Sequence, residues 1–345
     1  MKNSIDESLH SVRYICIEDD IGIVFNSKGE TMEVSIIGAS GKIGSVLSLL
    51  LAKESYIKNI NLIARNGSIN KLKGLKMDLY DAMAAAGQDT NIQICSDDDL
   101  SCTGTSDITI VTAGMARTGD MSRIDLMREN AKIIKNYAKK IANAGDTKIF
   151  MISNPVDMMT YKAFIESGYE KNQVFGLGTH LDSMRFKVAV AKYFEVHIDD
   201  VRTRIVGEHG DSMVPLISAT AVGGIPIVRL PKYENFPYDR ILEKIKGYGK
   251  EIIDLKNGSE YGPASAIVNI VRCIAHDEKR LLTLSAYIED EIEGIKGGSC
   301  IGVPVKVGKN GIEEVIHMKM NDDEIEGFKK SFDLVKGYCK EIESI

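Results

Sequence analysis

Residues 32–44 have the sequence MEVSIIGASGKIG, and this stretch decides the fold. The first six residues are mostly apolar, as in a strand that a parallel sheet buries on both faces. A glycine-rich turn follows, and a helical pattern then begins. Glycines permit a tight turn and a close approach of the backbone to a pyrophosphate, while the next helix offers free N–H groups at its N-terminus. Between a strand and a helix this spacing predicts a dinucleotide-binding loop rather than a merely structural turn. The loop residues are Gly38, Ala39, Ser40, Gly41, Lys42, Ile43 and Gly44.

Strands and helices then alternate along the chain. The short apolar segments 60–64, 92–95, 108–112 and 148–153 predict strands, and the patterns 42–53, 70–86 and 123–143 predict helices. This alternation is typical of an α/β protein with a Rossmann-type doubly wound parallel sheet, whose crossovers are right-handed.

The rhythm changes after about residue 155. We expect a helix from near Leu181, mixed strands over 201–227, helices over 238–255 and 263–275, strand pairs over 280–307 and a final helix over 322–343. The sequence therefore predicts three parts. They are an N-terminal extension (1–31), a dinucleotide-binding domain (32–155) and an α+β substrate/catalytic domain (156–345).

The extension has two strand-like patches, 12–17 and 21–25, before the clean strand that starts at Met32. It is either a natural addition, such as a hairpin, or upstream sequence read from the wrong start codon. N-terminal sequencing of the native protein distinguishes the two.

Composition excludes several classes of protein. The 345 residues are 44% hydrophobic and 27% charged, as in a soluble globular chain, which excludes overall disorder. A net charge of −6 is a poor match for a general nucleic-acid binder. No apolar run approaches the roughly 18 residues of a membrane span, and the N-terminus lacks a secretory pattern. The six cysteines form no CxxC pair, so we expect reduced thiols, a cytoplasmic location and no metal site.

The second strand lacks the acid that usually binds the ribose 2′-hydroxyl of NAD. Ala64 occupies that position and Arg65 follows it. A guanidinium there can pair with a 2′-phosphate, and Asn66 and Ser68 can add hydrogen bonds. The sequence therefore favours NADP over NAD. The alternative is a solvated arginine and NAD bound without the acid.

A histidine between glycines, His209, is the candidate proton donor and acceptor, because an imidazole titrates near neutrality. Asp182 and Arg185 are three residues apart and share a helix face. Asp182 could orient His209, and Arg185 could hold a substrate carboxylate; the alternative is a surface ion pair. We expect nearby His180 to be structural.

Two further loops carry polar residues at predicted strand ends, where ligands bind in such sheets. Residues 113–123 contain Arg117 and Arg123, which a mobile lid could bring over a bound anion. Ile152, Ser153 and Asn154 end the next strand, and Asn154 could reach both substrate and cofactor.

Together these motifs resemble the lactate/malate dehydrogenase family, and within it the enzymes of methanogenic archaea that act on malate. The resemblance spans residues 32–340 and includes GASGKIG, SNPVD, GLGTHLDSMR and GEHGDSMVPL in order. It implies a reversible hydride transfer between (S)-malate and oxaloacetate with NAD(P)(H), a place in the tricarboxylic acid cycle, and a homotetramer or homodimer.

The resemblance also implies individual roles. His209 would exchange the proton with Asp182 as its partner, Arg185 would clamp the C1 carboxylate, and Arg123 would polarise the carbonyl. Arg117 would bind the second carboxylate, which makes a broader lactate-like 2-hydroxycarboxylate dehydrogenase the weaker alternative. Asn154 would bridge substrate and cofactor, before a cis proline. Gly114 and Asn130 would lie beside the nicotinamide ribose. A metal-dependent glycosidase and a nucleotide-sensing protein are the remaining alternatives, which EDTA-insensitive turnover would exclude.

Overall fold

The computed structural model describes residues 12–17, 20–25, 31–115, 122–292 and 294–345. Side chains are described from Thr31 onward within these ranges, except for that of Arg123. Strands β1 (Val12–Ile17) and β2 (Asp20–Phe25) pair as an antiparallel hairpin.

One nine-stranded sheet organises the described chain, in the order β16-β15-β14-β8-β7-β6-β3-β4-β5. Its parallel strands are β5 (Asn91–Ser96), β4 (Ile57–Ala64), β3 (Met32–Ile37), β6 (Ile108–Val111), β7 (Lys148–Met151) and β8 (Val174–Gly176). The central strands are largely buried, with Val34, Ile36 and Ile110 at 0% exposure. The predicted doubly wound parallel sheet is confirmed.

The sheet continues beyond its parallel half. Strand β14 (Arg280–Ile288) pairs antiparallel with β8, and β15 (Ser299–Gly308) and β16 (Gly311–Val315) extend the sheet further. The parallel strands and the strands of the second half thus share one hydrogen-bonded sheet. Two further small sheets lie outside it. One pairs β10 (Ile205–Val206) with β11 (Val214–Pro215), and the other has the order β13 (Ile225–Pro226), β12 (Ala221–Val222), β9 (Val201–Arg202).

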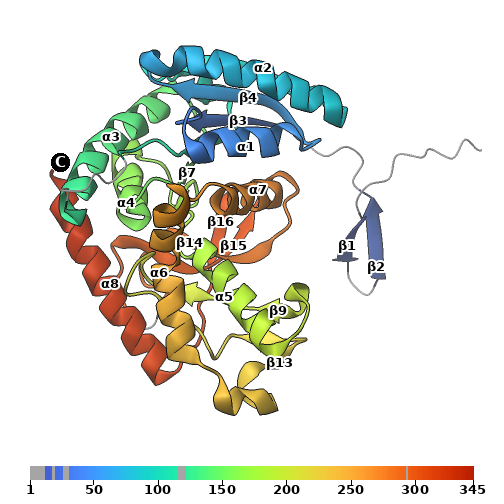
Figure 1. Cartoon of the computed structure of the whole chain (residues 1–345), viewed down its shortest axis with the longest axis vertical. Helices are drawn as coiled ribbons and strands as arrows, with labels where there is room; N and C mark the ends of the chain where they lie inside the picture. The colour runs from blue at the N-terminus through green and yellow to red at the C-terminus, as the bar shows by residue number, and fades with distance from the viewer. Residues whose placement is uncertain (1–11, 18–19, 26–30, 116–121, 293) are drawn as a thin grey trace, which may run out of the picture.

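Helices cover the sheet and complete the second half (Figure 1). Helices α1 (Lys42–Ala52), α2 (Ile69–Ala86), α3 (Arg123–Ala144) and α4 (Val156–Ser167) belong to the first part of the chain, and α5 (His180–Phe194), α6 (Tyr238–Lys256), α7 (Tyr261–Ala275) and α8 (Asp322–Glu343) to the second. Helix α8 runs along one side of the molecule and reaches α3 and α4, while α7 packs on α1 (Figure 1). The two halves are therefore packed together by helices as well as by the sheet.

Local signals explain where several helices begin and end. Ser122 caps α3 by accepting a hydrogen bond from the Asp125 N–H at 3.0 Å. Asn321 and Glu324 form a reciprocal capping box at the start of α8. Gly87 ends α2 with a positive φ of 66°, which glycine adopts without strain. Within the described ranges, none of the helices combines the length and the apolar character needed to span a bilayer.

Candidate functional site

The turn after β3 is closed tightly by its glycines. The N–H groups of Gly38 and Ala39 both donate to the Ile63 carbonyl of β4, at 2.9 and 3.1 Å. Gly38 has φ +91°, a left-handed conformation that favours glycine. A Cβ at Gly44 would lie 2.4 Å from the Gly38 carbonyl oxygen, so only a glycine lets α1 come this close to the turn. The backbone thus forms a cradle in front of the N-terminus of α1.

A cavity of about 540 Å³ opens beside this turn, at the carboxyl ends of the parallel strands. Residues from the ends of β3, β4 and β6 and from α3 line it: Gly38, Ser40, Gly41, Ala64, Arg65, Ser68, Thr112, Ala113, Gly114, Met115, Ile133 and Tyr137. All twelve are apolar, neutral polar or basic. A cavity of this kind at a strand-order reversal, β4-β3-β6, is where doubly wound sheets bind dinucleotides.

Some of the residues predicted to bind the cofactor do not line this cavity. The ammonium group of Lys42 donates to the Asn257 carbonyl at the end of α6. The side chain of Asn66 donates to Asp98 and accepts from Ser96 Oγ at 2.8 Å. Neither residue belongs to the cavity lining, and neither do Ile43 and Gly44, which lie in the first turn of α1.

Asn130 joins two loops at the mouth of this cavity. It is 1% exposed on α3, its Oδ1 accepts the Met115 N–H at 2.7 Å, and its Nδ2 donates to the Asn154 carbonyl at 2.8 Å. Ser153 Oγ in turn donates to the Ala113 carbonyl at 2.5 Å. The loops after β6 and β7 are therefore held together by buried side chains. Ile152 is buried between them, at 7% exposure.

The Asn154–Pro155 peptide bond is cis, as the resemblance implies. The Asn154 residue itself is exposed. Arg117 lies outside the described residues. Arg123 begins α3, and its side chain is also outside the description.

Two predicted catalytic residues, Asp182 and His209, meet the predicted substrate-binding Arg185 at the start of α5. Asp182 and Arg185 lie in the first turns of α5, and His209 lies in the loop after β10 (Ile205–Val206). Asp182 is fully buried, with Oδ2 2.5 Å from Nδ1 of His209 and Oδ1 2.9 Å from Nη1 of Arg185. Its two oxygens thus hold the imidazole and the guanidinium. The His209 side chain is 24% exposed and that of Arg185 is 13% exposed, so both can meet a small ligand.

The charges tune this group for proton exchange. Burial disfavours the ionised form of Asp182, but the charge of His209, its hydrogen bond and Arg185 outweigh burial and lower the pKa of that carboxyl. Burial opposes the imidazolium of His209, while the charge and hydrogen bond of Asp182 and the charge of Asp157 favour it, and the net effect raises its pKa. The pair therefore consists of a carboxylate and a histidine that holds its proton more firmly than usual.

The sequence predicts no role for Asp157, although this residue ends the SNPVD motif. Asp157 is 1% exposed in the first turn of α4, and its Oδ2 accepts the main-chain N–H of His209 at 2.8 Å. Its Oδ1 accepts from Ser285 Oγ at 2.6 Å. The neighbouring Glu208 accepts from Ser212 Oγ at 2.7 Å, which fixes the other side of the loop. A carboxylate in the first turn of a helix rich in apolar residues was the available signal, and it is a weak one.

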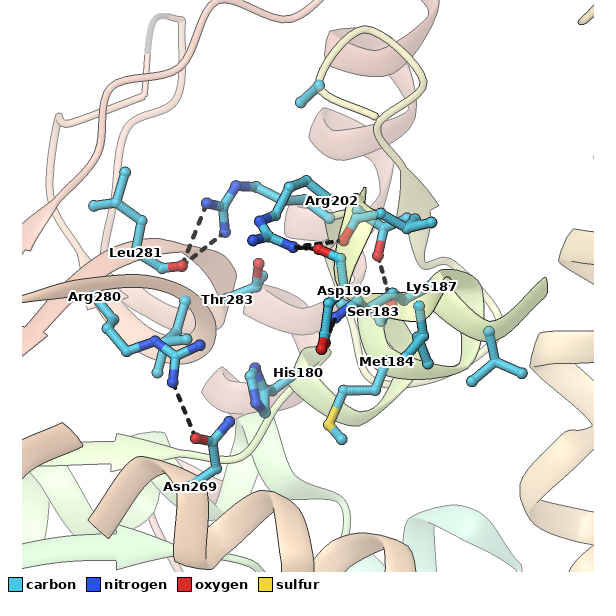
Figure 2. Close-up of a pocket in the computed structure, with 17 residues that line it drawn as sticks. His180, Ser183, Met184, Lys187, Asp199, Arg202, Asn269, Arg280, Leu281 and Thr283 are labelled. Atoms are coloured by element: carbon cyan, nitrogen blue, oxygen red, sulfur yellow. Dashed lines mark hydrogen bonds and ion pairs between the residues drawn. The ribbon is translucent and has the colours of Figure 1, made fainter. Parts of the chain in front are cut away.

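His180 begins α5 and is not part of the Asp182–His209 contact. It lines a second cavity, of about 470 Å³, between α5 and β14. Figure 2 shows its imidazole pointing into this cavity, which Lys187, Arg202 and Arg280 also line. Burial, together with the positive charges of Arg280 and Arg204, lowers the pKa of His180 to about 4, so the ring is neutral near pH 7. Among the described residues no hydrogen-bond partner reaches its Nε2.

Comparisons with known proteins agree with this architecture. Residues 32–176 match the lactate/malate dehydrogenase NAD binding domain, and residues 179–345 match the alpha/beta C-terminal domain of the same family. The chain is 88% identical to the malate dehydrogenase of Methanococcus maripaludis over 314 residues, which are 91% of this chain and 100% of the relative. It is 58% identical to the L-2-hydroxycarboxylate dehydrogenase (NAD(P)(+)) of Methanocaldococcus jannaschii, with the same coverage.

Solved structures show the same likeness. The malate dehydrogenase of Picrophilus torridus superimposes with a TM-score of 0.83 at 33% identity, covering 91% of this chain and 98% of that one. Both domain models, the relatives and the sheet order point the same way. The chain belongs to the lactate/malate dehydrogenase family and is an NAD-dependent oxidoreductase.

Proposed function

We propose that the protein is a malate dehydrogenase that transfers a hydride reversibly between (S)-malate and oxaloacetate. The observation that carries this proposal is the shared carboxylate of Asp182, which places the proton-exchanging His209 beside the cationic Arg185. A 2-hydroxy acid needs a proton acceptor for its hydroxyl and a cation for its carboxylate, and this arrangement supplies both.

The mechanism follows from the charges. During oxidation His209 takes the hydroxyl proton, and Asp182 stabilises the resulting imidazolium. During reduction the protonated His209 returns that proton as negative charge develops on the substrate oxygen. Arg185 holds the C1 carboxylate, and we assign to Arg123 the polarisation of the carbonyl. The nicotinamide supplies the chemistry of hydride exchange when it is bound.

We further propose that Arg117 binds the second carboxylate, which would make the substrate a dicarboxylate. The relative from Methanocaldococcus jannaschii gives a specific reason for a second candidate, because its name denotes a broader L-2-hydroxycarboxylate dehydrogenase. A wider substrate range is therefore the alternative, and a panel of 2-oxo acids separates the two.

The glycine cradle fits a dinucleotide, since a Cβ at Gly38 or Gly44 would lie within 2.7 Å of neighbouring atoms and fill the turn. We propose that NADP is accepted and preferred. Arg65 and Ser68 line the cavity where a 2′-phosphate would lie, and Ala64 brings no carboxylate to repel it. Asn66 would join them only after its side chain leaves Asp98.

The remaining assignments are also proposals. Gly114, Asn130, Ile152, Ser153 and Asn154 would surround the nicotinamide end of the cofactor, and Asn154 would also bind substrate. We expect a cytoplasmic homotetramer or homodimer.

The test is reduction of oxaloacetate by the full chain, with NADPH and NADH compared side by side and pyruvate as control substrate. We expect a higher kcat/KM with NADPH and a clear preference for oxaloacetate. In an Arg117→Gln variant the discrimination against pyruvate should fall by about 10- to 100-fold, because one substrate carboxylate loses its partner. Equal use of both acids by the parent enzyme would refute the role of Arg117, and a strong NADH preference would refute that of Arg65.

A further inference from the structure

A second buried carboxylate is built into the support of His209. Asp157 lies three residues after Asn154, in the first turn of α4. One of its oxygens accepts the His209 N–H and the other accepts the Ser285 hydroxyl of β14. A single side chain thereby ties α4, β14 and the His209 loop together, although these segments are far apart in the chain.

Burial of an ionised carboxylate at this position is energetically unfavourable. Both hydrogen-bond donors to Asp157 are neutral, and no ion pair between Asp157 and a lysine or arginine is found in the described residues. Burial raises the pKa of Asp157 to about 6, against the lowering effect of Ser285 and His209. An asparagine could accept the His209 N–H and donate to the Ser285 hydroxyl, and so keep both contacts without the cost of a buried charge. The charge itself therefore calls for an explanation.

The explanation lies in the charges that face His209. Asp182 and Arg185 approach it from α5, one negative and one positive, and Asp157 approaches it from α4. The charge of Glu208, the preceding residue in the loop, slightly raises the pKa of Asp157. Arg185 disfavours a second positive charge at the imidazole, while Asp157 favours it. Asp157 thus offsets part of the effect of the substrate-binding cation on the proton-exchanging histidine.

We propose that Asp157 is a positioning residue for His209, whose carboxylate fixes the main chain of the loop and adds a second negative charge in favour of the imidazolium. The inference rests on the proposed role of His209 in proton exchange. It adds to that role a second carboxylate: Asp182 on α5 and Asp157 on α4 would both favour the protonated form of His209.

Three variants separate geometry from charge. Asp157→Asn keeps the shape, the acceptor for the His209 N–H and a donor for Ser285, but it removes the charge. Ser285→Ala removes one hydrogen bond and leaves the charge. Asp157→Ala removes the charge and both hydrogen bonds. The first measurement is an NMR titration of the full chain with 13C-labelled histidine, without substrate or cofactor, with the His209 signal assigned by its loss in His209→Gln.

We expect His209 to titrate at a lower pH in Asp157→Asn than in the parent and to change much less in Ser285→Ala. In turnover, the alkaline limb of kcat/KM for oxaloacetate reduction should move to lower pH in Asp157→Asn, because the imidazole loses its proton earlier. Asp157→Ala should lower kcat about 10- to 100-fold with a smaller change in KM, since the proton donor is displaced.

The proposal is overturned if His209 titrates in Asp157→Asn as it does in the parent, or if Ser285→Ala shifts it equally. Should Asp157→Ala not fold, Asp157→Asn still decides. Absence of oxaloacetate turnover in the parent would refute the proposed function, whereas the NMR titration would still test the effect of Asp157 on His209.

Discussion

Asp182 and His209 are 27 residues apart in the chain, yet Oδ2 of the fully buried carboxylate lies 2.5 Å from Nδ1 of the imidazole. This contact leaves Nε2 as the ring nitrogen that can exchange a proton with a substrate. It also explains why the pKa of His209 is raised although burial alone would lower it. The contact is the basis of the first prediction.

Asp182→Asn should lower kcat for oxaloacetate reduction about 10²- to 10⁴-fold, because an amide neither stabilises the imidazolium nor enforces the tautomer. Loss of the negative charge should also lower the pKa of His209 and shift the alkaline limb of the pH profile to lower pH. Steady-state kinetics from pH 6 to 9 would measure both effects. The control is Asp78→Asn on the exposed face of α2. A kcat within a few-fold of the parent would contradict the assigned role of the pair.

Arg65→Ala should lower kcat/KM for NADPH about 10- to 100-fold and leave that for NADH nearly unchanged, because only the 2′-phosphate loses a charged partner. Ala64→Asp should act in the same direction by repelling that phosphate. The matched control is Arg229→Ala, an exposed arginine remote from the cavity. Equal losses with both cofactors would mean that Arg65 supports the loop rather than the phosphate.

Gly44→Ala should disturb the glycine turn. The new Cβ would lie 2.4 Å from the Gly38 carbonyl oxygen and 2.7 Å from Ala39 Cα, so the backbone must move. We expect the free energy of unfolding to fall by about 1–3 kcal/mol and the affinity for NADPH and NADH to weaken together. Urea unfolding and fluorescence titration would measure these effects. Gly74→Ala, in α2 with nothing within 4 Å of its Cβ, should instead be neutral or stabilising. Parent-like affinity in Gly44→Ala would contradict the tight-turn argument.

The strands of the parallel sheet that are buried on both faces could mostly be predicted from the sequence. Strands such as β3 are mostly apolar because both of their faces are largely buried, and their pattern is therefore plain. Strand β4 begins at Ile57, earlier than the predicted residue 60, since the polar Lys58 and Asn59 hide its start. Strand β8 escaped prediction altogether, because its three residues are too few to show a period.

Two side-chain contacts between distant residues could not be predicted from the sequence, although the pairing of Asp182 with His209 could. Lys42 binds a carbonyl 215 residues away, and Asp157 binds Ser285 at a separation of 128 residues. A motif indicates which residues are functional. The partners that their side chains contact depend on how the helices pack in the folded protein. The link between Asp157 and His209 depends on the packing of α4 against the His209 loop, and no local sequence pattern encodes that contact.

His180 should make the protein sensitive to acid. Its pKa is about 4 in the folded chain and about 6.5 when exposed, so the unfolded chain binds more protons between these values. The neutral ring contributes full stability above pH 6.5, and this contribution is lost as the pH falls toward 4. From pH 7.5 to pH 5 the loss should be about 2 kcal/mol. Urea unfolding at the two pH values and at fixed protein concentration would measure it.

His180→Asn should reduce this pH dependence, because the buried titrating group is removed. His197→Asn, at a histidine whose side chain is 74% exposed, controls for the change of residue type and should leave the dependence in place. If His180→Asn loses as much stability between pH 7.5 and pH 5 as the parent, the acid sensitivity resides in other groups. That outcome would mean that the imidazole in the second cavity is protonated without cost to the fold. Its burial at 7% exposure, and the lack of a partner for Nε2 among the described residues, argue against this.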